Sequence, residues 1–152
     1  RIVTTTPVNG LWSEHVTVNA AAEPGEHMTP PNPILMTERP DIPDSDNIPA
    51  DIMLLHIGDL MLVTQPAEVF AETAITLKIH LRALGYKIPA LVTYANGFLL
   101  YLPEPEDFPE GGYEVDSSMD YYGFPTRLAL GTEDRLIAAA RALVPREYSA
   151  RR

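Results

Sequence analysis

Residues 52–64 read IMLLHIGDLMLVT, two apolar runs that are joined by Gly58 and Asp59. A glycine in a two-residue turn can take a positive φ, so the two runs predict a β-hairpin. Both runs are almost continuously apolar, which is typical of strands covered on both faces. We therefore expect a hairpin whose two faces are both buried.

The next segment, residues 66–84, has the pattern of a helix. Pro66 fits a first helical turn, Glu68 suits the positive end of the helix dipole, and Gly85 is a stop signal. Ile75 and Ile79 fall almost opposite the main apolar stripe, so we expect a helix that is covered on two sides, within a body larger than 152 residues. The main stripe consists of Phe70, Ala74, Leu77, Leu81 and Leu84.

Further along the chain, residues 90–94 predict a buried strand parallel to the strand at Leu60, with the helix as the crossover. Residues 103–126 are rich in proline and glycine and predict a long irregular segment. Thr132 is expected to cap a last helix that ends before Pro145, with Leu136, Ala140 and Leu143 on one face. The predicted fold class is α/β, a mixed sheet with flanking helices.

Residues 1–50 contain eight of the fifteen prolines, which excludes a continuous helix and predicts an extended arm. Short strands are expected at 2–6, 15–19 and 34–37. The arm either drapes over this domain or pairs with another polypeptide, and we favour the second. The expected organisation is this arm, an α/β segment over 51–145 and a frayed tail over 146–152.

The composition excludes several classes of function. A net charge of −10 and a pI near 4.7 argue against binding to nucleic acid or to anionic lipid surfaces. The chain has no cysteine for a disulfide or a thiolate metal site, and no run of 18 apolar residues for a transmembrane segment. It begins at Arg1 rather than Met, so we expect a processed or proteolysed piece of a longer protein.

Two longer motifs resemble a known family. They are IGDLMLVTQPAEVFAETAITLKIHL at 57–81 and YANGFLLYLPEPEDFPEGGYEVDSS at 94–118. Their order resembles the closing part of the catalytic domain of the neutral/alkaline ceramidases, zinc amidases that cleave the N-acyl bond of sphingolipids. Ala67 stands where this family usually has glycine. The resemblance covers about residues 47–144 and implies an extracellular or periplasmic protein.

The resemblance implies that Glu68 and Tyr101 are ligands of Zn²⁺, which accepts carboxylate oxygen beside histidine nitrogen. From the residues alone, Glu68 also fits a solvated carboxylate that balances a helix dipole, and Tyr101 fits a packed aromatic residue. The four histidines form no metal-binding pattern. Solvated side chains are the default for His15 and His27 in the arm, and structural roles are favoured for His56 and His80. In the family, the histidine ligands come from the earlier part of the catalytic domain.

Further residues resemble the substrate side of the family's site. Tyr113 is the candidate catalytic residue, and the candidate pocket residues are Asn96, Gly97, Gly112, Glu114 and Ser117. A simple turn with a docking tyrosine explains residues 111–118 equally well.

The leading hypothesis is therefore that this chain is the C-terminal segment of a ceramidase-like zinc amidohydrolase, which uses metal-activated water. The missing ligands would come from the remaining N-terminal polypeptide or from a second subunit. Its substrate would be an amide, for which a lipid amide is one candidate. The alternatives are a non-catalytic interaction subunit with the same fold and an amidase of this scaffold that acts on a non-lipid amide.

Overall fold

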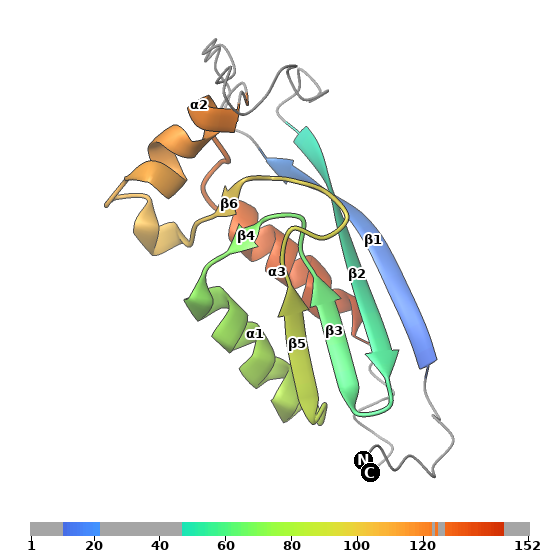
Figure 1. The fold of residues 1–152 in the computed structure, drawn as a ribbon. Helices are drawn as coiled ribbons and strands as arrows, with labels where there is room; N and C mark the ends of the chain where they lie inside the picture. The colour runs from blue at the N-terminus through green and yellow to red at the C-terminus, as the bar shows by residue number, and fades with distance from the viewer. Residues whose placement is uncertain (1–10, 22–46, 123, 125–126, 145–152) are drawn as a thin grey trace, which may run out of the picture.

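A computed structural model describes residues 11–21, 47–122, 124 and 127–144. These residues form a four-stranded mixed sheet in the order β1-β2-β3-β5 and a two-stranded sheet of β4 and β6 (Figure 1). The strands of the main sheet are β1 (Leu11–Ala21), β2 (Asn47–Ile57), β3 (Leu60–Thr64) and β5 (Ile88–Val92). The predicted α/β class is confirmed.

The hairpin predicted at 52–64 is the centre of this sheet. β2 and β3 pair antiparallel with Ile57 opposite Leu60, and Gly58 in the turn has φ of 61°. β3 then pairs with β5 in parallel, with Leu60 opposite Ile88, through the crossover helix α1 (Ala71–Ala83). The parallel strand is thus confirmed, although it begins and ends two residues earlier than predicted.

The proline-rich arm contributes a strand to the same sheet. β1 includes the predicted strand at 15–19 and pairs antiparallel along its whole length with β2 of this chain. From the sequence we favour pairing of the arm with another polypeptide, and for β1 this is wrong. β2 offers a full edge of unbonded N–H and C=O groups, and β1 satisfies them. The strands expected at 2–6 and 34–37, and the tail at 146–152, lie outside the described residues.

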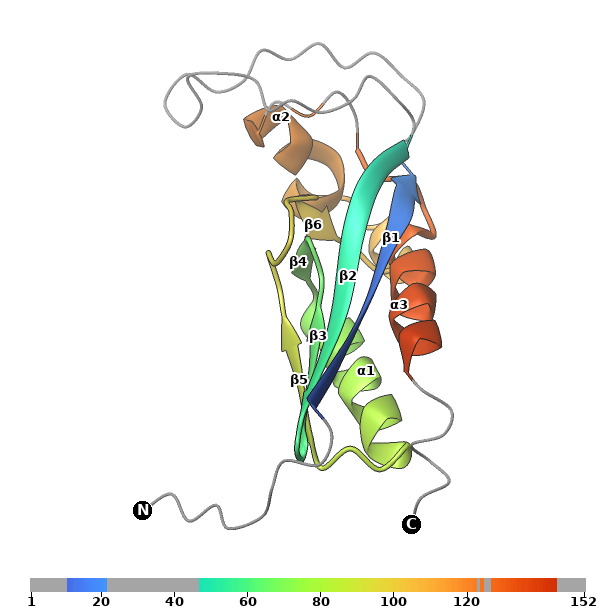
Figure 2. The same ribbon diagram turned by 90° about the vertical axis from the view of Figure 1, so that its right-hand side faces the viewer.

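Both long helices lie on one face of the main sheet (Figure 2). α1 contacts β5, while α3 (Thr132–Leu143) contacts β1 and β2. Alternate residues of β2 and β3 point into this layer, so that Ile52, Leu54 and Met61 are completely buried. Leu77 and Leu81 of α1 and Leu136 of α3 complete the same core.

The opposite face of the sheet is apolar and open among the described residues. Ile57, Ile88 and Val92 are 40%, 56% and 41% exposed, and Met53, Leu55 and Leu62 are only half-buried. On the outer side of α1, Ile75 and Ile79 are also exposed. The two-sided apolar pattern of the sequence is therefore real, but the described residues cover only one side of the sheet and of α1.

The start of the first helix differs from the prediction. α1 begins at Ala71 instead of Pro66, because residues 65–68 are bonded to a loop far along the chain, and Glu68 and Val69 form the short strand β4 (Glu68–Val69). The predicted end is confirmed, since Leu84 is the C-cap and Gly85 has φ of 101°.

The segment at 103–126 is less irregular than predicted. It contains the 3₁₀ turn η1 (Pro105–Asp107), the π-helical turn η2 (Tyr113–Ser117) and the short helix α2 (Ser118–Tyr122). Thr132 is the first residue of α3 instead of its cap, a position held by Gly131 with φ of 83°. In the described part of the chain, no helix is long and apolar enough to cross a membrane.

Candidate functional site

The candidate ligands Glu68 and Tyr101 lie on two short strands beyond the ends of β3 and β5 (Figure 1). β4 pairs in parallel with β6 (Tyr101–Leu102), and Glu68 is the direct partner of Tyr101 in this register. Neighbouring strands are about 4.8 Å apart, so the two side chains leave the backbone as close neighbours. The carboxyl ends of the parallel strands β3 and β5 therefore bring these two residues together, as expected for such sheets.

The loop 93–100 fixes this register through main-chain hydrogen bonds to residues 65–68. The Ala95 N–H donates to the Gln65 carbonyl at 3.1 Å, and the Leu99 N–H donates to the Pro66 carbonyl at 2.7 Å. The Glu68 N–H in turn donates to the Leu100 carbonyl at 2.7 Å. These bonds hold the backbone of residues 65–68 against the loop 93–100.

The backbone of the same loop is strained. Tyr94, Asn96 and Leu100 have φ of 54°, 65° and 64°, a region that side chains other than glycine rarely adopt. Each such residue costs on the order of 1–3 kcal/mol, and the strain persists only where surrounding contacts impose it. Strain of this kind is commonly found at functional sites.

The carboxylate of Glu68 is surrounded by phenols. The hydroxyl of Tyr94 donates to Oε2 of Glu68, and Tyr101 is the register partner of Glu68 on the neighbouring strand. Burial raises the pKa of Tyr94, and the hydrogen bond and negative charge of Glu68 raise it further. Burial and the charge of Glu68 likewise raise the pKa of Tyr101. Both phenols are therefore protonated at neutral pH, and Tyr94 acts as a hydrogen-bond donor to Glu68.

Tyr113 lies beside Tyr101. Its ring is edge-on to Tyr101 with centroids 5.7 Å apart, and it is also edge-on to Tyr121. Burial is the main cause that raises the pKa of Tyr113, so this phenol also keeps its proton at neutral pH. The candidate catalytic tyrosine is thus a neighbour of one candidate ligand.

Three of the predicted pocket residues accompany Tyr113. Gly112 precedes η2 with φ of 106°, and its N–H donates to Asp116 at 3.0 Å. Glu114 and Ser117 lie in η2 with exposed side chains. The structure therefore places these three beside Tyr113 as one surface turn.

The other two predicted pocket residues lie in the loop 93–100. The side-chain amide of Asn96 donates to the Thr64 hydroxyl at 2.9 Å. Gly97 has φ of 155°, and a Cβ at this position would approach Cβ of Pro66 to 3.3 Å. Asn96 and Gly97 thus hold the loop against residues 64–66. Local packing alone is therefore a sufficient reason for an asparagine and a glycine at these positions.

Tyr94 and Tyr122 belong to this site but are not among the residues singled out from the sequence. Tyr94 stacks on Phe98 with ring centroids 5.6 Å apart, and Phe98 is edge-on to Tyr122 at 5.0 Å. The only sequence signal for Tyr94 is that it opens the motif YANG directly after the parallel strand.

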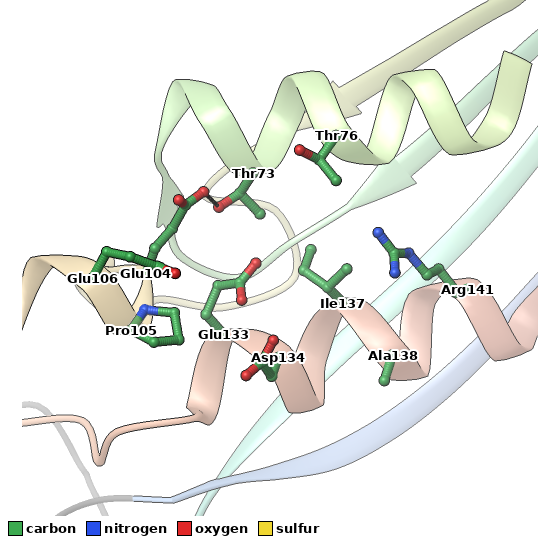
Figure 3. Close-up of a pocket in the computed structure, with 10 residues that line it drawn as sticks. All are labelled: Thr73, Thr76, Glu104, Pro105, Glu106, Glu133, Asp134, Ile137, Ala138 and Arg141. Atoms are coloured by element: carbon green, nitrogen blue, oxygen red, sulfur yellow. Dashed lines mark hydrogen bonds between the residues drawn. The ribbon is translucent and has the colours of Figure 1, made fainter.

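A separate pocket of about 560 Å³ opens between α1, α3 and η1 (Figure 3). Glu104 and Glu133 reach toward Thr73 from opposite sides, with Arg141 further along α3. Burial and the charge of Asp134 raise the pKa of Glu133. None of the predicted site residues lines this pocket, whose walls are Thr73, Thr76, Glu104, Pro105, Glu106, Glu133, Asp134, Ile137, Ala138 and Arg141.

The donors of Glu68 and Tyr101 fit zinc, but they make an incomplete set. Zn²⁺ takes four ligands and accepts carboxylate oxygen together with histidine nitrogen. The described residues contain no group of three or more His, Cys, Asp or Glu side chains arranged to hold a metal. His56 is buried against the ring of Tyr86, and His80 lies on α1. A complete site needs further donors from elsewhere.

Solved structures of ceramidases are similar to this chain. Neutral ceramidase from Pseudomonas aeruginosa is 19% identical, with a TM-score of 0.48, over 63% of this chain and 15% of that chain. A ceramidase complexed with C2 is 21% identical, with a TM-score of 0.44, over 70% of this chain and 15% of that chain. This chain therefore spans about 15% of the length of each.

Neither a model of a protein family nor a curated protein matches the sequence. The two structures named above are those of ceramidases.

Proposed function

We propose that this chain is part of a zinc-dependent amide hydrolase resembling neutral ceramidase, with Glu68 and Tyr101 as two of the metal ligands. The observation that carries the proposal is the β4–β6 register, in which these two residues are direct partners. They are 33 positions apart in the sequence, yet the register makes them neighbours, and the negative charge of Glu68 raises the pKa of Tyr101. Two oxygen donors thus converge at one point.

The remaining ligands would be histidines from the remaining N-terminal polypeptide or from a second subunit. When bound, Zn²⁺ supplies Lewis acidity, which activates water as a nucleophile and polarises an amide carbonyl. The residues of this chain would hold the ion and orient the amide beside it. Tyr113 keeps its phenolic proton at neutral pH and lies beside Tyr101, so it would donate a hydrogen bond to the carbonyl oxygen of the substrate.

The open apolar surfaces support the need for a partner. One face of the sheet and the outer side of α1 both present isoleucine to solvent, at Ile57, Ile75, Ile79 and Ile88. Near-continuous apolar strands such as β2 and β3 are typical of a sheet that is covered on both faces. The rest of a longer catalytic domain, or a second subunit, would cover these surfaces and bring the histidine ligands.

A non-catalytic interaction subunit with the same fold is the alternative function. It is kept because the described part of the chain contains no group of three or more His, Cys, Asp or Glu side chains that could hold a metal. An amidase of this scaffold that acts on a non-lipid amide is a variant of the main proposal with the same metal residues.

Replacement of Glu68 by Gln in the complete protein tests the function. The change removes the charged oxygen donor with little change in size, so we expect the metal affinity to fall by roughly 10- to 100-fold or more, the loss that even supporting residues of metal sites produce. Bound zinc would be measured by elemental analysis, and turnover with an N-acyl amide.

Glu72→Gln is the matched control, because Glu72 is exposed in the first turn of α1 and close in sequence. It should keep both the metal and the turnover. If E68Q also kept full zinc content and activity, Glu68 would not be a ligand and the non-catalytic function would be favoured instead.

A further inference from the structure

Tyr94 is held beside Glu68 by three separate contacts. Its backbone N–H donates to the carbonyl of Ala67 at 3.3 Å. Ala67 is the residue that precedes Glu68, so this bond holds the backbone of Tyr94 close to that of Glu68. Its ring is stacked on Phe98 at an interplanar angle of 18°. Its hydroxyl donates to Oε2 of Glu68. Backbone, ring and hydroxyl are thus all fixed with respect to one carboxylate.

This arrangement has a backbone cost that simple packing does not explain. Tyr94 has φ of 54°, and it is 43% exposed, so its burial contributes less than that of a core tyrosine. Strained non-glycine residues persist where the surrounding structure requires their position. The position achieved here is the one that directs the phenolic O–H to Glu68.

The contact restricts the carboxylate of Glu68. A glutamate side chain loses considerable rotamer freedom when it is fixed in one position. Because the hydrogen bond to one oxygen already fixes it, this entropy cost is not added when a ligand binds. With Oε2 held by Tyr94, the carboxylate stays beside the register partner Tyr101. Groups that hydrogen-bond to metal ligands raise metal affinity in this way by about 10- to 100-fold.

We propose that Tyr94 is a positioning residue, whose hydroxyl orients Glu68 for metal binding next to Tyr101. The inference rests on the proposed function, because it assumes that Glu68 is a ligand. Tyr94 acts only through Glu68 and does not itself contact the metal or the substrate.

The test compares three single variants in the complete protein, with Zn²⁺ alone as the probe and a competing chelator to set the free concentration. Tyr94→Phe removes the hydroxyl and keeps the ring that stacks on Phe98. Tyr121→Phe is the control, since Tyr121 is similarly exposed and its ring contacts Tyr113 and Tyr122. Phe98→Leu keeps the Tyr94 hydroxyl but removes its stacking partner.

We expect Y94F to weaken zinc binding about tenfold with an unchanged melting temperature, Y121F to stay within about twofold of the parent, and F98L to lose clearly less affinity than Y94F. A second readout uses Co²⁺ in place of zinc, because its visible absorption spectrum reports the ligand geometry. That spectrum should shift in Y94F and not in Y121F.

The outcomes separate the two levels of the proposal. If Y94F binds zinc as the parent does while E68Q loses it, the positioning role of Tyr94 is wrong and the function stands. If F98L weakens zinc binding as much as Y94F, ring packing rather than the hydroxyl is responsible, and the inference is again wrong. If E68Q retains zinc, both the function and the role of Tyr94 are refuted.

Discussion

Gln65 provides a stability prediction that is independent of any metal. Its side chain is completely buried, and among the described residues neither Nε2 nor Oε1 has a hydrogen-bond partner. Burial of an amide without hydrogen bonds costs about 1–3 kcal/mol by mutational estimates. Gln65→Met keeps the length and flexibility of the side chain and removes both polar atoms. We therefore expect the free energy of unfolding to rise by about 1–3 kcal/mol.

For a protein of this size, each kcal/mol corresponds to about 2–4 °C in melting temperature. Urea unfolding at neutral pH would measure the gain directly, provided that the slope of the free energy of unfolding against urea concentration is the same in both proteins. Ala142→Met is the control, because this position on α3 is exposed and the change should stay within about 0.5 kcal/mol. A loss of stability in Q65M would refute the reasoning, since it would mean that a buried water or another group satisfies the amide.

Two further predictions concern pH and assembly. The pKa of Glu133 is raised in the folded state, so folding favours the protonated form of this side chain. The free energy of unfolding should therefore fall as the pH rises from below about 4.5 through the raised pKa. Glu133→Gln should remove this fall in urea titrations between pH 4 and 7, and an unchanged pH dependence would contradict the assignment. The open apolar faces predict that the isolated chain associates or unfolds without cooperativity, whereas with its partner it should bury more than about 2,000 Å². Sedimentation of the isolated chain as a stable, cooperatively unfolding monomer would speak against this.

The hairpin and the crossover could be predicted from the sequence because their signals are local. The turn at Gly58, the apolar runs on both sides of it and the stripe at Leu77 and Leu81 all lie within one element or its immediate neighbour. The structure confirms each of them. Periodicity and turn chemistry decide such elements with little help from the rest of the chain.

The start of α1 could not be predicted in the same way. Pro66 and Glu68 have the local pattern of a helix start, but main-chain bonds from Leu99 and to Leu100 hold this segment in a bend followed by the short strand β4. A tertiary contact therefore overrides a valid local signal. Local propensity contains no information about a partner segment about thirty residues away.

The candidate site shows the same limit. The family resemblance identifies Glu68 and Tyr101, and the structure places them side by side, but their role as metal ligands stays a prediction. Tyr94 could not be identified because its partner Glu68 lies 26 positions away, in a segment expected to be helical. Only the observed path of the loop 93–100 brings the two side chains together.

The bonds between that loop and residues 65–68 have a consequence for how this scaffold can change. They join backbone groups, so they depend on the path and length of the loop and hardly at all on which side chains it presents. An insertion or deletion of one residue before β6 would place Leu100 or Leu102 opposite Glu68, and the neighbouring oxygen donor would be lost. Substitutions at positions 68 and 101 would leave those bonds intact. The same frame could thus exchange one pair of reactive groups for another without first acquiring a new fold.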